Sequence, residues 1–142
     1  MIRAGRIGGT RTGPTRDAYD TVLLPMADAR IYHVCRREEW RNAESSGLYV
    51  GSTQDVADGF IHFSSAAQIV ESVARHRAGQ DGLVIIEVDS ARLGDGLRWE
   101  ASRRGDLFPH VYGKLALTSV VRVAALPLGA DGRHVFPWGL AA

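Results

Sequence analysis

Residues 82–89, GLVIIEVD, form the most apolar segment of the chain and limit the possible folds more than any other feature. The segment is rich in β-branched side chains, which favour a strand. It is apolar on both faces for most of its length, a pattern typical of a strand that is covered on both sides. We therefore expect this strand to lie in the centre of a sheet.

From residue 30 onward the order is strand, helix, strand, helix, strand, and then strands only. Residues 48–58 read as a loop, and Pro109 confines its strand to an edge or a bulge. Because the strands crowd toward the C-terminal half without intervening helices, the order predicts an α+β fold with two main helices and a largely antiparallel sheet. The expected strands are 30–34, 59–63, 82–89, 97–100, 108–114 and 119–126, and the expected helices are 36–46 and 65–78.

The two helices have recognisable ends and apolar stripes. Trp40 and Ala43 lie three residues apart in the shorter helix, and Gly47 ends it. Ser65 and Gln68 have the spacing of a capping box at the start of the longer helix. Its stripe recurs at helical spacing through Ala66, Ile69, Val70, Val73 and Ala74.

Composition limits the classes of protein to which the chain can belong. Its 142 residues suit one domain, and the single cysteine, Cys35, indicates a reducing cytoplasmic setting. The net charge of +1 does not favour nucleic acid as a partner, and no apolar run is long enough to cross a membrane. Residues 1–25 show no strand or helix period, so we expect an extension outside the core or a start placed too early, with one domain over 26–142.

Three of the five histidines, His33, His62 and His110, lie in the middle of apolar strands. A buried imidazole without hydrogen-bond partners costs about 1–3 kcal/mol, so three such positions exceed what packing requires. They are candidate catalytic residues on one cleft, although each alone is equally consistent with a core histidine. Glu100 ends a strand and is a candidate general base or a ligand for a sugar hydroxyl.

Aromatic side chains accompany these histidines. Phe60 shares a strand face with His62, and Tyr112 shares one with His110, so planar rings such as nicotinamide or adenine have walls on which to stack. Tyr32 is a further candidate wall. The sequence contains no G-x-G-x-x-G, P-loop or G-x-S-x-G motif and no H-x-H or H-x-x-x-H pair, so we expect no metal site.

Several motifs together resemble one bacterial family, catalogued as domain of unknown function 952. They are IYHV at 31–34, GLYVGS at 47–52, DGFIHFSSAAQI at 58–69, LVIIEVD at 83–89, LRWE at 97–100 and FPHVYGKL at 108–115. The resemblance covers residues 31–126 and implies an ADP-ribosyltransferase-like fold, a split mixed sheet that holds NAD⁺ in a cleft.

Within that superfamily the histidine pattern is similar to that of RNA 2′-phosphotransferases. By this analogy His33 contacts a ribose of NAD⁺, while His62 and Ser64 enter the same pocket. The sequence departs from the pattern, since Phe60 replaces a second histidine and YHVC replaces H-G-T. Three functions remain open: an NAD⁺-dependent transferase, an acid–base enzyme for an unrelated small metabolite, and a non-catalytic nucleotide-binding module.

Overall fold

The computed structural model describes residues 30–102 and 104–140, so the predicted extension over residues 1–25 lies outside the described residues. The chain forms an α+β fold, as the order of elements predicts, and every strand pairing in the described ranges is antiparallel. A parallel component, which the predicted mixed sheet requires, is therefore not seen there. No helix in these ranges is long and apolar enough to span a membrane.

The strands form three small sheets. The central sheet has the order β1 (Arg30–Arg36), β4 (Leu83–Asp89) and β8 (Val120–Leu126), which confirms the central position predicted for residues 83–89. The histidine sheet has the order β3 (Ile61–His62), β6 (Leu107–Val111) and β5 (Leu97–Ala101). A third pair joins β2 (Leu48–Tyr49) to β7 (Leu115–Ala116).

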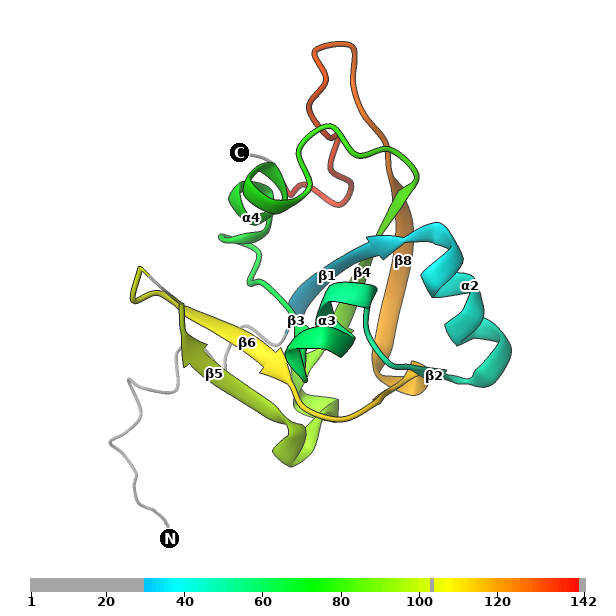
Figure 1. Cartoon of the computed structure of the whole chain (residues 1–142), viewed down its shortest axis with the longest axis vertical. Coiled ribbons are helices and arrows are strands. Elements are labelled where there is room, and N and C mark those ends of the chain that lie inside the picture. The colour runs from blue at the N-terminus through cyan, green and yellow to red at the C-terminus, as the bar shows by residue number, and fades with distance from the viewer. Residues whose placement is uncertain (1–29, 103, 141–142) are drawn as a thin grey trace, which may run out of the picture.

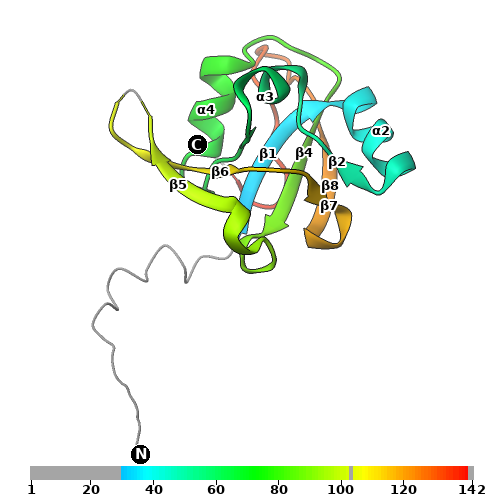
Figure 2. The same cartoon turned by 60° about the horizontal axis from the view of Figure 1, so that its bottom comes forward.

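Within the described residues, a single backbone bridge connects the central sheet to the histidine sheet. Tyr32 of β1 and Ser64, which follows β3, exchange N–H···O bonds of 2.8 Å in both directions. The β5–β6 hairpin extends away from the central sheet on the other side of β3 (Figures 1 and 2). The β structure is therefore split, with one narrow junction beside the two strands that carry His33 and His62.

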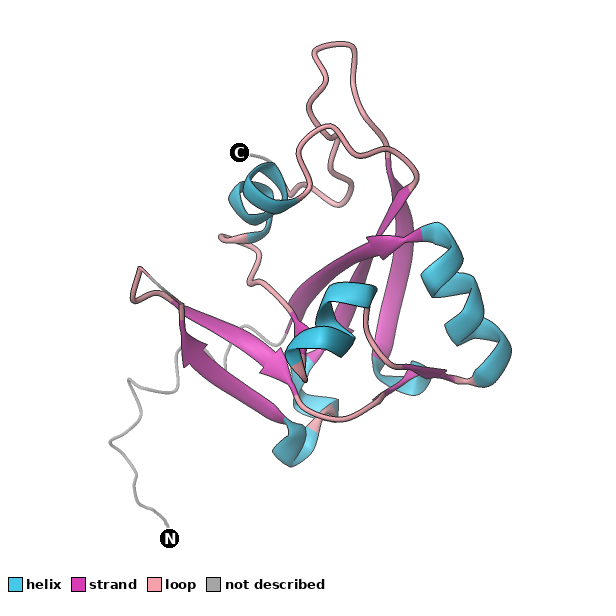
Figure 3. Cartoon of the chain, in the orientation of Figure 1, coloured by secondary structure: helices cyan, strands magenta, loops and turns pink. Residues whose placement is uncertain are grey.

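The described part of the chain holds three α-helices where two were predicted, and Figure 3 shows them around the sheets. Helices α2 (Arg37–Ser46) and α4 (Ile69–His76) confirm the predicted pair, although α4 starts later and ends earlier than expected. Helix α3 (Thr53–Asp58) falls within the predicted loop 48–58, so that prediction was wrong there. Its cause is visible in the sequence, because Ser52 and Asp55 make a reciprocal capping box.

The side chains of the central sheet enter a different core on each face. On one face Ile31 and Cys35 pack with Trp40 of α2 and with inward residues of the histidine sheet. On the other face Tyr32 packs with Ile69 of α4 and with the C-terminal residues up to Leu140. Because successive residues of β1 alternate between these cores, β1 is buried on both faces.

Pro109 lies in the middle strand of the histidine sheet, so the prediction of an edge or bulge was wrong. Strand β6 pairs with β5 on one side and β3 on the other. The carbonyl of Pro109 accepts from the Phe63 amide at 2.9 Å, but proline has no N–H to return the bond. The β3 ladder stops at this register, which is how the sheet accommodates the proline.

Candidate functional site

Strand alternation places a group of polar and aromatic side chains on one surface, which we call the outer face of the histidine sheet. The alternate residues Ile61 and Val111 point into the core, and Trp99 packs against it. The outer face therefore receives the residues between them, whose side chains are partly or largely exposed. They are Phe60, His62, Arg98, Glu100, Phe108, His110 and Tyr112.

His62 is oriented by the carboxylate of Asp55 from helix α3. Its Nδ1 and its backbone N–H donate to Asp55 Oδ1 at 2.6 Å and 3.1 Å, and its Nε2 lies 3.3 Å from Asp58 Oδ2. The side chain of His62 is 42% exposed, whereas that of Asp55 is only 3% exposed. A buried carboxylate thus fixes an accessible imidazole.

Asp55 is held as an anion by several donors. Burial by itself raises the pKa of this carboxyl, but hydrogen bonds from His62 and Ser52 and the nearby His33 ring outweigh it and lower the pKa to about 2. Gly51 leaves room for the Asp55 side chain, because a Cβ at position 51 would lie 2.6 Å from Asp55 Cβ. The φ of Gly51 is +102°, a conformation that favours glycine. The turn before α3 is therefore shaped around this carboxylate.

His110 has a carboxylate partner of its own. Its Nδ1 donates to Glu100 Oε1 at 2.7 Å, and the Tyr112 hydroxyl donates to the same oxygen at 2.8 Å. The hydrogen bond from His110, and to a lesser extent that from Tyr112, lowers the pKa of Glu100. The hydrogen bond between Tyr112 and Glu100 raises the pKa of Tyr112. Three predicted site residues are therefore joined in one hydrogen-bonded group.

The rings of the outer face are in direct contact. The centroids of His62 and His110 are 5.3 Å apart, and Phe60 stacks on His110 with centroids separated by 4.2 Å. Phe60 also lies 4.5 Å from His62 and 5.3 Å from Tyr112. Two histidine–carboxylate pairs are thus packed against one aromatic ring. Phe60 shares a face with His62, and Tyr112 shares one with His110, as strand alternation predicts.

His33 lies beneath the outer face, so the structure does not place all three strand histidines on one surface. The imidazole is 3% exposed, its Nδ1 donates to the His62 carbonyl at 2.6 Å, and its Nε2 accepts from the Tyr49 hydroxyl at 2.6 Å. Burial lowers the pKa of His33, although the Asp55 charge opposes this, and a neutral ring fits both bonds. With both nitrogens engaged, His33 supports the backbone of His62.

Two predicted ligand contacts lie elsewhere. Tyr32 faces the core on the other side of β1, because it neighbours His33 along the strand, and its hydroxyl donates to Glu87 at 2.7 Å. Ser64 is buried and joins the two sheets through its backbone bonds to Tyr32. Both residues stabilise the fold beside the site, and neither lies on the outer face.

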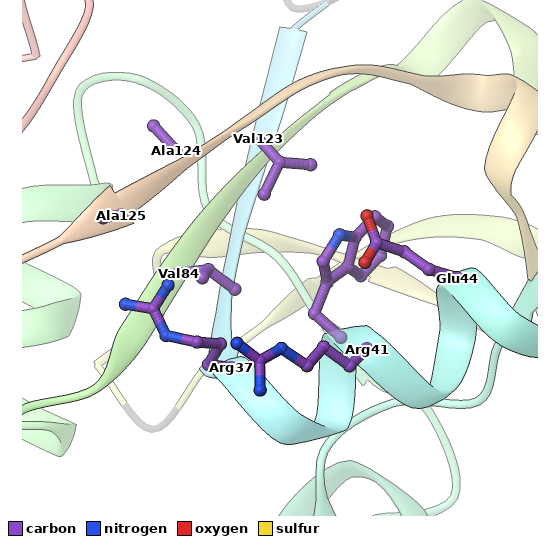
Figure 4. Close-up of a pocket in the computed structure, with 8 residues that line it drawn as sticks. Arg37, Arg41, Glu44, Val84, Val123, Ala124 and Ala125 are labelled. Carbon is purple, nitrogen blue, oxygen red and sulfur yellow. The ribbon is translucent and has the colours of Figure 1, made fainter.

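Two hollows of the surface are lined by residues other than the histidines. One, with a volume of about 310 Å³, lies between α2 and β8, where Arg37, Arg41 and Glu44 surround Val84 and Val123 (Figure 4). Another, of about 440 Å³, is lined by Glu71, Ala74, Arg75 and Arg104. The side chains of the outer face are partly or largely exposed, and neither of these two hollows is lined by them.

Sequence reasoning missed Asp55, Asp58 and the position of Arg98 on the outer face. Asp55 had a detectable signal, because Ser52 and Asp55 have capping-box spacing, but the segment was read as a loop. No group of three or more His, Cys, Asp or Glu side chains suited to a metal ion occurs among the described residues. The outer face thus presents two imidazoles with oriented tautomers, a guanidinium and aromatic rings.

The fold and site together define a small α+β domain with a paired histidine–carboxylate face. A family model described as "Protein of unknown function (DUF952)" matches residues 34–123, and the chain belongs to this family. The crystal structure of protein CC0527 from Caulobacter crescentus is 44% identical, with a TM-score of 0.71 over 75% of this chain and 93% of that one. No curated protein matches.

The solution NMR structure of CC0527 is similar as well. It is 45% identical to this chain, with a TM-score of 0.67, and the match covers 74% of this chain and 90% of that one. The family resemblance drawn from the histidine and aromatic motifs is therefore confirmed at the level of the family.

Proposed function

We propose that the outer face is an active site for general acid–base catalysis on a small ligand of the nucleotide class. The observation that carries this proposal is the pair of imidazoles, His62 and His110, with ring centroids 5.3 Å apart and a carboxylate on each Nδ1. A carboxylate at Nδ1 of His110 fixes the tautomer that leaves its Nε2 to exchange protons. Nε2 of His62 lies 3.3 Å from Asp58 Oδ2, so this imidazole would exchange its proton beside a second carboxylate. Two such groups can remove a proton from one atom of a ligand and deliver one to another.

The rate enhancement expected from these two imidazoles is large. A positioned general acid or base contributes about 10²–10⁴-fold to a rate. The aromatic rings of Phe60 and Tyr112 supply a surface on which a base or nicotinamide can stack. This combination supports a planar ring joined to a sugar as the ligand.

The specific reaction that we propose is ADP-ribosyl transfer or hydrolysis with NAD⁺, in an ADP-ribosyltransferase-like fold. The bond between ribose C1 and the nicotinamide nitrogen breaks, and nicotinamide leaves with the electron pair. An acceptor hydroxyl or water attacks C1 and gives its proton to one imidazole. His110 and His62 would orient and deprotonate that acceptor, while His33 positions His62 from below.

Calorimetric titration with NAD⁺ and ADP-ribose, together with chromatographic assay of released nicotinamide, tests this proposal. We expect wild type to bind both, and His110→Ala to lose nicotinamide release by at least about 100-fold. His76→Ala is the matched control, because His76 is an exposed histidine of α4 that is not one of the outer-face residues. Absence of binding by wild type at millimolar NAD⁺ would overturn the assignment of this ligand.

One observation favours a second candidate function. His33, which would hold the ribose by analogy, has both ring nitrogens engaged inside the protein. Acid–base chemistry on an unrelated small metabolite needs only His62 and His110 and does not require His33 to reach the ligand. A metabolite that is turned over by wild type but not by His110→Ala, with no effect of NAD⁺, would select this alternative.

A further inference from the structure

We propose that Arg98 anchors an anionic group of the ligand, a phosphate, at the β5 side of the outer face. The inference rests on the proposed function for the choice of this face, but it concerns binding and requires no turnover. It names the class of ligand as a phosphate monoester that carries a planar ring, such as a nucleoside 5′-phosphate.

The strand register places three nitrogen-bearing side chains in one row. His62 lies opposite His110 across β3 and β6, and His110 lies opposite Arg98 across β6 and β5. Neighbouring strands are about 4.8 Å apart, so the row crosses about 10 Å of the outer face. A ligand of nucleotide size can contact the whole row.

The two ends of the row differ in the charged groups that surround them. At the β3 end, both ring nitrogens of His62 face carboxylates, Asp55 at 2.6 Å and Asp58 at 3.3 Å. At the β5 end, Arg98 is exposed and has no carboxylate oxygen within 4.0 Å among the described residues, although the charge of Glu100 is near enough to interact with it. The negative group of a ligand is therefore favoured at Arg98 and disfavoured at His62.

Neighbouring side chains leave the guanidinium available and give it a direction. Glu100, two residues along the same strand face, already accepts from His110 and Tyr112 through Oε1. The Arg98 guanidinium carbon lies 4.9 Å from the centroid of the Tyr112 ring, a cation–π contact that holds the side chain over the site. Its N–H groups form the fork that suits a phosphate in two-point contact.

The aromatic rings determine which phosphates fit. A ring that stacks beside Tyr112, or on His110 in the place of Phe60, lies next to Arg98, because Arg98 contacts the Tyr112 ring and lies opposite His110. Inorganic phosphate would then bind weakly, and a phosphate joined to a planar base would bind more tightly. Adenosine, which lacks the phosphate, would lose the contribution of Arg98.

NMR titrations with inorganic phosphate, adenosine and AMP test the assignment on wild type, Arg98→Ala and Arg98→Lys. We expect AMP to bind most tightly, with shifts on β5 and β6, and Arg98→Ala to weaken AMP by about tenfold or more without changing adenosine. Arg98→Lys should fall between, since it keeps the charge but loses the fork. Arg41→Ala on α2, another exposed arginine, is the matched control and should bind like wild type.

Three results would overturn the proposal: AMP affinity within twofold of wild type in Arg98→Ala, phosphate shifts confined to residues away from β5, or no binding of AMP by wild type. The outcome is separable from that of the proposed function. If AMP binds through Arg98 and no substrate is turned over, the acid–base proposal fails and the phosphate contact stands.

Discussion

Asp55→Asn is the substitution that most directly probes how the site is built. The carboxylate accepts from Ser52 N at 2.7 Å through Oδ2 and from the backbone and ring of His62 through Oδ1. Asparagine replaces one of these oxygens with an NH₂ group, which faces a donor instead of accepting from it. The variant therefore removes a charge and leaves at least one buried donor without an acceptor.

The pKa of Asp55 gives the size of the effect. Lowering it from 3.8 to about 2 corresponds to about 2 kcal/mol of stability for the ionised form. An unsatisfied buried donor adds about 1–3 kcal/mol. We expect Asp55→Asn to lower the free energy of unfolding at pH 7 by about 3–5 kcal/mol.

Urea unfolding followed by circular dichroism measures this difference, with Asp58→Asn as the control. Asp58 lies on the same helix, but its side chain is 36% exposed, so its substitution should change stability by less than about 0.5 kcal/mol. The pKa of Asp55 is lower in the folded state. Its contribution is thus complete above the ordinary pKa and is lost as the pH falls from about 4 to about 2.

The gap between wild type and Asp55→Asn should therefore be constant above pH 5 and narrow below pH 4. An equal stability of Asp55→Asn and Asp58→Asn at pH 7 would refute the reasoning. A gap that stays unchanged down to pH 3 would refute the electrostatic part of it, because hydrogen-bond geometry alone would then account for the loss.

Three further substitutions have definite expected outcomes. Tyr49→Phe removes the hydroxyl that donates to His33 Nε2, so urea unfolding should show a loss of about 1–2 kcal/mol with AMP affinity unchanged. Gly51→Ala places a Cβ 2.6 Å from Asp55 Cβ at φ +102°, and thermal unfolding should show a loss of at least about 2 kcal/mol. Glu87→Gln breaks the ion pair between the buried Glu87 and the half-exposed Arg122. Burial alone raises the pKa of Glu87, but the hydrogen bond from Arg122 outweighs it and lowers the pKa, so urea unfolding should show a loss of stability that shrinks on acidification.

Much of the fold was predictable because its signals are local. The apolar run at 83–89 predicted the central strand, and Trp40 with Ala43 predicted the buried stripe of α2. Helix α3 was missed because six residues are too few to show an apolar period, although its capping box was present. Pro109 was misplaced because its effect depends on which neighbour its nitrogen faces, and sequence does not show this.

The candidate site was predictable only in part. Alternation along the strands correctly grouped Phe60 with His62, and His110 with Tyr112, because neighbouring positions on one strand are fixed by its period. Which face of each strand is exposed depends on the partner sheet. His33 and Tyr32 were therefore both expected near the ligand, although each faces a different core.

The sequence by itself determined the α+β class, the central strand, the DUF952 resemblance and the residue types that carry the chemistry. These properties follow from short-range periodicity and from motifs of a few residues. Only the tertiary structure decided that Asp55 and Glu100 each hold one histidine, that His33 is buried and that Arg98 lies in the same row. Hydrogen bonds between distant segments depend on strand register and sheet packing, and a single sequence does not specify either of them.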